Sequence, residues 1–164
     1  MQNDVYIHVM TKQTNLPAAM ALANDAARDC ACLQARTLSR QITRAYDAAL
    51  RDSGLKITQF TMLAAVVASG DGRSLTELAD LLGMDRSTFS RNLTPLVRRG
   101  LVQHTNVLKG RSRGARATEA GQTVFAQSAP AWRAAQDRLR RQLASGERTG
   151  FLDDLRTVNT LLKS

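Results

Sequence analysis

The 164-residue chain is poor in the residue types on which metal binding, disulfide bonding and catalysis most often depend. It has two cysteines and only two histidines, and we see no ligand set among them for Cys-rich zinc chemistry. Cys30 and Cys32 lie two positions apart in a segment with helical periodicity, where their side chains point in different directions, so we expect reduced thiols. The chain also lacks a glycine-rich phosphate loop and a Ser/His/Asp set. We therefore expect no metal, no cofactor and no enzymatic activity.

Aromatic residues and long apolar runs are also scarce. Aromatic residues make up 4% of the chain, so a core must come mainly from leucine, alanine and valine, which favours an α-rich fold. No apolar run approaches the roughly 20 residues that cross a bilayer. Residues 1–20 also lack the basic and apolar regions of a secretory signal. These absences predict a cytoplasmic protein without a membrane partner.

Acidic residues are missing from the segment in which basic residues are most concentrated. The chain has 23 basic and 14 acidic residues and a net charge of +9. Residues 86–116 contain no Asp or Glu and eight basic residues: Arg86, Arg91, Arg98, Arg99, Lys109, Arg111, Arg113 and Arg116. A solvated surface usually mixes charges of both signs, so this bias favours a polyanionic partner such as nucleic acid. The alternative is an ordinary soluble helix face followed by a flexible hairpin.

Hydrophobic periodicity places helices on both sides of this basic segment. Residues 1–25 show little periodicity and contain Pro17, so we expect a flexible arm. Residues 26–51 form one apolar stripe typical of a long helix, and residues 58–69 form a second helix with Thr58 as its N-cap. A helix from Thr118 to about Leu143 contains Pro130, and a last helix spans about 147–162. The last helix has apolar residues at heptad-like spacing, which suits a partner helix: Phe151, Leu155, Val158 and Leu162.

The segment from Ser74 to Gly100 has the layout of a helix-turn-helix. Ser74 and Glu77 fit a capping box, Gly83 interrupts the first helix, and Asp85 can cap the second. The second helix has apolar residues on one side and cationic or hydroxylic residues on the other. Such residues can bind phosphates and base edges in the major groove of DNA. The candidate DNA-binding residues of this helix are Arg86, Ser87, Thr88, Ser90, Arg91, Thr94 and Arg98.

A short β-hairpin is predicted directly after this helix. Residues 101–105 read as a strand, 106–114 as a loop rich in glycine and arginine, and Arg116 lies on a short return strand. The loop adds Lys109, Arg111 and Arg113 to the candidate DNA-binding residues. Cationic side chains on such a hairpin suit the narrow minor groove.

The sequence LTELADLLGMDRSTFSRNLTPLVRRGLVQH, a basic hairpin and then ATEAGQ together resemble the MarR family of winged-helix regulators. The resemblance implies a mainly α fold with a small β-hairpin wing, and an obligate dimer formed by the first and last helices. It also implies that the helix after Asp85 reads the major groove, and that the protein is a repressor released by a small apolar or phenolic ligand. The family's wing usually has an Asp two residues before its main Arg, whereas this chain has Lys109 before Arg111.

These patterns predict four segments. Residues 1–25 are a flexible N-terminal arm, 26–57 a dimerisation helix, 58–118 a winged helix-turn-helix lobe that binds DNA, and 119–164 C-terminal dimerisation helices. The expected partners are double-stranded DNA and a second copy of the chain. An alternative to a DNA-binding regulator is a basic winged-helix module that binds RNA, an acidic protein or a membrane surface without recognising a DNA sequence.

Two features are candidates for a switch. In members of the family that sense organic hydroperoxides, the reactive cysteine lies at the position of Cys32, counted back from Tyr46, so oxidation of Cys32 is an alternative to ligand binding. In the alternative interpretation, Cys30 and Cys32 are small apolar side chains that pack in a helix interface and have no redox role. A cavity for an apolar ligand near Tyr46, Phe60 and Trp132 is the second candidate, and the alternative is that these aromatic rings are core.

Overall fold

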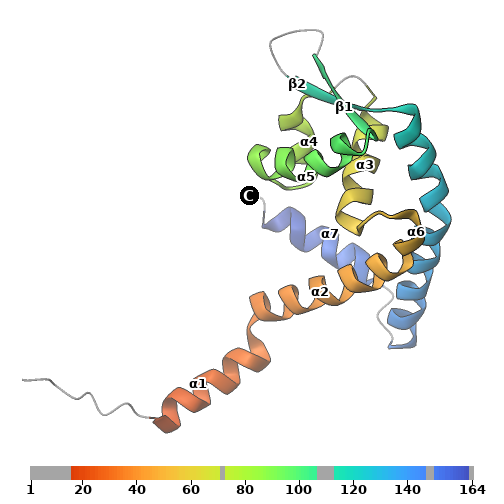
Figure 1. The fold of residues 1–164 in the computed structure, drawn as a ribbon. Coiled ribbons are helices and arrows are strands. Elements are labelled where there is room, and N and C mark those ends of the chain that lie inside the picture. The colour runs from red at the N-terminus through yellow and green to blue at the C-terminus, as the bar shows by residue number, and fades with distance from the viewer. Residues whose placement is uncertain (1–15, 71–72, 107–112, 147–149, 163–164) are drawn as a thin grey trace, which may run out of the picture. The chain divides into compact units, whose positions relative to one another are not determined.

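The computed structural model describes residues 16–70, 73–106, 113–146 and 150–162, most of which are helical (Figure 1). The chain divides into two compact units, with the boundary between Ile42 and Thr43. Within the described ranges, no helix is both long enough and apolar enough to span a bilayer. The fold is mainly α with one two-stranded antiparallel hairpin, as the sequence predicted.

The first unit contains helix α1 (Leu16–Asp29) and most of helix α2 (Ala31–Ala49). The prediction of a flexible arm up to residue 25 was wrong from Leu16 onward, because Pro17 is the second helical residue. The first-turn N–H groups of a helix have no intrahelical partner, so proline costs nothing there. The predicted helix over 26–51 is divided at Cys30 between α1 and α2, and the Gln34 side chain donates there to the carbonyls of Ala27 and Arg28.

The second unit contains the end of α2, a 3₁₀ turn (Arg51–Ser53) and helix α3 (Ile57–Ser69). The prediction of Thr58 as the N-cap of α3 was wrong, because the helix begins one residue earlier. The Asp47 carboxylate accepts a hydrogen bond from the Ile57 N–H at 2.7 Å and forms an ion pair with Lys56 at 3.6 Å. The first N–H of α3 is therefore capped from the preceding helix, while the Lys56 N–H donates to Gln59 of α3 itself at 3.0 Å.

The next elements are helix α4 (Leu75–Leu81), helix α5 (Arg86–Arg98), strand β1 (Val102–Asn106) and strand β2 (Arg113–Ala117). The predicted capping box of α4 is confirmed: the Ser74 N–H donates to Glu77, and the Glu77 N–H donates to the Ser74 hydroxyl. The predicted cap of α5 is also confirmed, because Asp85 accepts from the Thr88 N–H at 2.8 Å. Both caps satisfy backbone donors that a helix leaves free.

The strands pair from Val102 opposite Ala117 to Asn106 opposite Arg113. One isolated bridge joins Ser74 to Gly114, so the start of α4 lies beside the hairpin. Helices α3, α4 and α5 and the hairpin share one apolar core, whose largest fully buried side chains include Leu63, Leu78, Phe89, Leu93, Leu96 and Val102. This core makes α4, α5 and the hairpin a single lobe (Figure 1).

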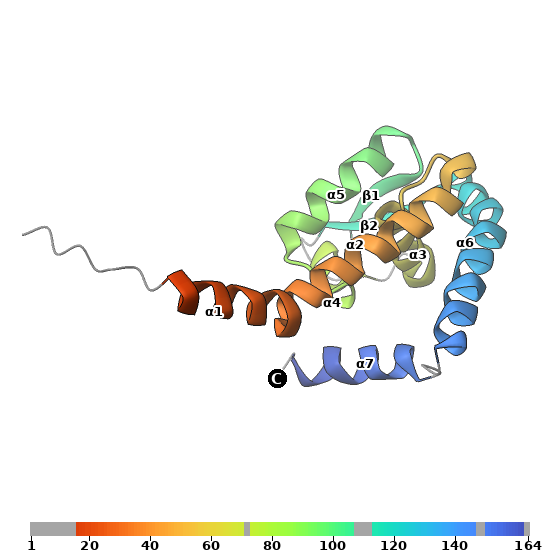
Figure 2. The ribbon, with the colours of Figure 1, turned by 90° about the horizontal axis from the view of Figure 1, so that it is seen from below.

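Helix α6 (Glu119–Ser145) runs along one side of this lobe, and helix α7 (Phe151–Leu161) follows it (Figure 2). Aromatic rings join α6 to α3. The Phe60 ring lies 5.0 Å from Phe125 and 5.8 Å from Trp132 between ring centres. α6 continues through Pro130, as α5 continues through Pro95. The predicted last helix begins later than expected, at Phe151, and residues 147–149 lie outside the described ranges.

The first turn of α6 is fixed to the end of α5 by close backbone contact. The Thr118 hydroxyl donates to the Gly100 carbonyl at 2.6 Å, and the Thr118 N–H donates to the Leu101 carbonyl at 3.0 Å. A Cβ atom at Gly121 would lie 2.0 Å from the Leu101 carbonyl oxygen, which is far inside contact distance. Only glycine allows α6 to approach the chain this closely.

Gly121→Ala is therefore expected to lower the free energy of unfolding by about 3 kcal/mol or more, because backbone and not a flexible side chain must move. Urea unfolding measures this loss. Gly146→Ala is the matched control, since its Cβ would lie 3.6 Å from the nearest atom, an ordinary contact. Equal stability of the Gly121 variant and the wild type would contradict the close approach.

Acid is expected to weaken the fold through the cap of α5. Hydrogen bonds from Ser87 and Thr88 lower the pKa of the Asp85 carboxyl. The stabilising effect of this carboxylate is therefore complete above its unfolded-state pKa of about 4, and it is lost as the pH falls below that value. Asp85→Asn should lose less stability than the wild type between pH 7 and pH 3 in urea unfolding. Asp80→Asn, at an exposed position on α4, should behave like the wild type; equal acid sensitivity of the wild type and Asp85→Asn would refute the effect.

Candidate nucleic-acid interface

The candidate interface is built on the outer face of α5. The inner face places Phe89, Leu93 and Leu96 in the core, with no measurable exposure of any of the three. Gly83, with φ of +63°, makes the turn that precedes the helix, and Asp85 fixes its first residue. Because three core side chains and one cap set the rotation of the helix, its remaining side chains have defined directions.

Four of the predicted residues form one straight row on the solvent side. Ser87, Arg91, Thr94 and Arg98 are spaced by four, three and four residues, which is the spacing of one helix face, and all four are exposed. Arg86 is also exposed, whereas Thr88 and Ser90 at the edges of the row are half-buried. The structure therefore exposes five of the seven predicted residues of α5, four of them in one row, and leaves the other two half-buried.

Local hydrogen bonds orient parts of this face. Arg91 Nη2 donates to the Thr88 hydroxyl at 3.1 Å, and the Thr94 hydroxyl donates to the Ser90 carbonyl at 3.1 Å. Arg86 and Arg98 form no ion pair within the described part of the chain. The face therefore presents three exposed guanidinium groups together with small hydroxylic side chains. Such a set can donate to phosphates and to the acceptor atoms of guanine.

Not every cation of the basic segment belongs to this face. Arg99 Nη1 donates to the Gly54 carbonyl at 2.8 Å and so connects the end of α5 to the turn before α3. Arg116 lies opposite Gln103 in the hairpin, and the Gln103 amide oxygen can accept from its guanidinium at 2.6 Å. Both arginines therefore stabilise the fold through these contacts, in addition to contributing positive charge to the basic segment.

The hairpin places the loop end of β2 beside the start of α4. Arg113 is exposed at the first position of β2, next to the bridge between Ser74 and Gly114. The predicted residues Lys109 and Arg111 lie outside the described residues. Arg73, directly before Ser74, is also exposed and was missed by the sequence analysis. Forty residues separate Arg73 from Arg113, and only the bridge shows that the two segments are neighbours.

The residues considered for a switch occupy different environments. Cys30 and Cys32 are free and exposed. The Tyr46 hydroxyl donates to the Gln136 side chain, and burial raises the Tyr46 pKa. Phe60 is buried in the core. A cavity of about 320 Å³ lies beside Trp132, and its other lining residues are polar: Arg133, Gln136, Asp137 and Arg140. Among the described residues, no group of three or more His, Cys, Asp or Glu residues could hold a metal ion.

Comparisons with known proteins agree with this arrangement. The family model described as MarR family matches residues 53–112. A crystal structure of the Mycobacterium tuberculosis transcriptional regulator MosR is 31% identical, with 84% of this chain and 98% of that chain covered and a TM-score of 0.72. A structure of MosR in complex with DNA is 35% identical, with 71% and 92% covered and a TM-score of 0.60.

A further similar structure is a MarR family transcriptional regulator from Silicibacter pomeroyi. It is 26% identical, with 80% of this chain and 94% of that chain covered and a TM-score of 0.65. No curated protein matches the chain. The helix-turn-helix, the hairpin and the 31% identity over nearly all of MosR lead to one conclusion. The chain belongs to the MarR family of winged-helix transcription regulators.

Proposed function

We propose that this protein binds duplex DNA in a sequence-specific manner as a homodimer and represses transcription. In this proposal α5 enters the major groove, and the hairpin with Arg113, and with Lys109 and Arg111 in its loop, lies in the adjacent minor groove. The observation that supports the proposal most directly is the row of Ser87, Arg91, Thr94 and Arg98 opposite the buried face of α5. The DNA complex of MosR, a 35% identical relative, supports it as well.

Exposed apolar side chains support the homodimer. Helices α1 and α7 contain no buried residue. On α1, Leu16, Met20 and Leu22 are more than half exposed, and α7 presents Leu155, Val158 and Leu161. Helices of 14 and 11 residues are only marginally stable by themselves, and large exposed apolar side chains favour association. A second copy of the chain would cover these surfaces. The apolar residues of α7 lie in the predicted C-terminal dimerisation segment, whereas those of α1 lie in the segment 1–25 that was predicted to be a flexible arm.

The DNA sequence that the protein binds can be obtained by selection from a random duplex pool. A homodimer with two α5 helices should select a palindrome with half-sites about one helical turn apart. A winged-helix module that recognises only charge would enrich no sequence. Selection therefore separates sequence-specific binding from the alternative of a basic interaction module.

Replacing Arg91 with alanine is expected to weaken binding to the selected duplex by about 1–3 kcal/mol, provided that Arg91 contacts a base edge. Fluorescence anisotropy at fixed salt measures the change. Arg138→Ala on α6 removes the same charge from an exposed position outside the proposed interface and should leave affinity within about twofold. Equal losses in the two variants would mean that net charge, and not the α5 face, determines binding.

Control of DNA binding has two candidate forms. The first is release of DNA when a small apolar ligand binds. The cavity beside Trp132 could hold such a ligand, and its mainly polar lining also suits a ligand with polar groups. Oxidation of Cys32 is the second, and the exposure of this thiol favours it. A hydroperoxide would oxidise the thiol to a sulfenic acid and would itself be reduced to an alcohol.

Cys32→Ser distinguishes the two forms of control. If oxidation is the switch, the variant should bind the selected duplex with wild-type affinity and should stay bound after treatment with an organic hydroperoxide. Cys30→Ser is the matched control and should still be released. Release of Cys32→Ser by peroxide, measured by anisotropy, would rule out this residue as the switch.

A further inference from the structure

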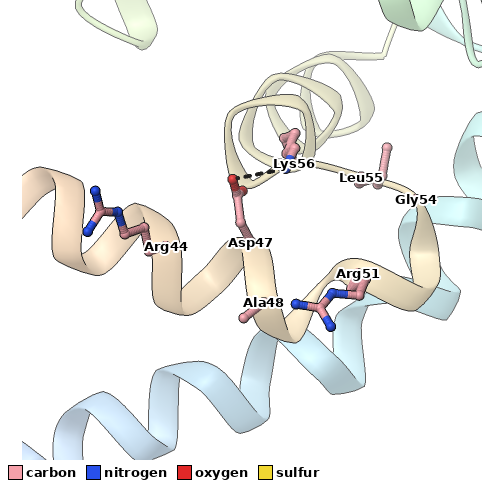
Figure 3. A pocket seen from close by; sticks show the side chains of 7 residues that line it. All are labelled: Arg44, Asp47, Ala48, Arg51, Gly54, Leu55 and Lys56. Carbon is pink, nitrogen blue, oxygen red and sulfur yellow. Dashed lines mark ion pairs between the residues drawn. The ribbon is translucent and has the colours of Figure 1, made fainter.

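A cavity of about 390 Å³ lies where α2 ends and α3 begins, within the second unit (Figure 3). Its lining includes the side chains of Arg44, Arg51 and Lys56 as cations, and that of Asp47 as the one carboxylate. The lining thus has a formal charge of +2. Leu55, which is 2% exposed, and Ala48 add an apolar part. Its volume lies at the lower end of the range of small-molecule sites.

The one carboxylate and one of the backbone carbonyls that line this cavity are already engaged. Asp47 Oδ1 accepts from the Ile57 N–H at 2.7 Å, and Oδ2 is paired with Lys56 Nζ at 3.6 Å. The carbonyl of Gly54, which also lines the cavity, accepts from Arg99. A ligand that donates hydrogen bonds would therefore compete with existing contacts at Asp47 and Gly54.

The donors, in contrast, are available. Figure 3 shows Arg44 and Arg51 on either side of Asp47. Within the described part of the chain, neither guanidinium has a hydrogen-bond or ion-pair partner. Lys56 precedes the first turn of α3, so the positive end of the helix dipole lies at the same place. Guanidinium groups bind phosphate oxygens in a bidentate manner, which suits an anionic ligand.

We propose that this cavity binds a small molecule bearing a doubly charged phosphate monoester group. Two negative charges match the net charge of the lining, and the phosphate oxygens need only donors. Leu55 and Ala48 receive a small apolar part of the molecule. A DNA backbone is a poorer fit, because the concave site holds one group and not a continuous row of phosphates.

Isothermal titration with inorganic phosphate and with phenyl phosphate, at constant ionic strength in chloride, tests the site. The wild type should bind one molecule per chain, and Arg44→Gln/Arg51→Gln should bind at least tenfold more weakly. Arg138→Gln/Arg141→Gln, which removes two exposed arginines of α6, should bind like the wild type. Thermal unfolding in chloride verifies that all variants are folded. Absence of binding by the wild type, or equal binding by the two double variants, would overturn the proposal.

A second measurement separates this site from DNA binding. In the absence of phosphate, Arg44→Gln/Arg51→Gln should bind the selected duplex with wild-type affinity. A loss as large as that of Arg91→Ala would show that the cavity contacts the DNA backbone, and it would also overturn the proposal. Because the titration needs no DNA, failure of the small-anion site and failure of the proposed DNA binding give different results.

Discussion

The geometry of the lobe depends on the burial of one side of α5. Phe89, Leu93 and Leu96 are fully buried, and each contributes about 1.5–3 kcal/mol relative to an exposed side chain. Rotating the helix would expose these side chains and would bury Arg91 and Arg98 without a counter-ion, which costs more. The apolar contacts thus determine which residues face solvent. The direction of the cationic face is a consequence of packing, and no interaction with DNA is needed to set it.

Much of this lobe could be predicted because its signals are local. The capping box of Ser74 and Glu77, the cap at Asp85 and the apolar spacing along α5 all lie within a few residues of one another. The hairpin follows from short strands around a loop rich in glycine and arginine. Each of these features is decided by neighbouring residues, so the sequence alone indicates both the helix-turn-helix and most of its solvent-facing side chains.

Features that depend on contacts between distant residues could not be read in this way. Asp47 caps a helix ten residues later, and Arg99 bonds to Gly54, 45 residues earlier. Arg73 joins the candidate interface only through the pairing of Ser74 with Gly114. The helical start at Leu16 was missed for a different reason, because proline interrupts a helix only beyond its first turn.

The contact of Gly121 with Leu101 also bears on how the two halves of a dimer would be coupled. Backbone approaches backbone there, so at Gly121 no side chain separates the start of α6 from the Leu101 carbonyl that follows α5. Helix α6 is 27 residues long, so a small rotation about its first turn would displace its far end by a larger distance. In a dimer held together through α6 and α7, a small tilt at the far end of α6 would change the spacing between the two α5 helices.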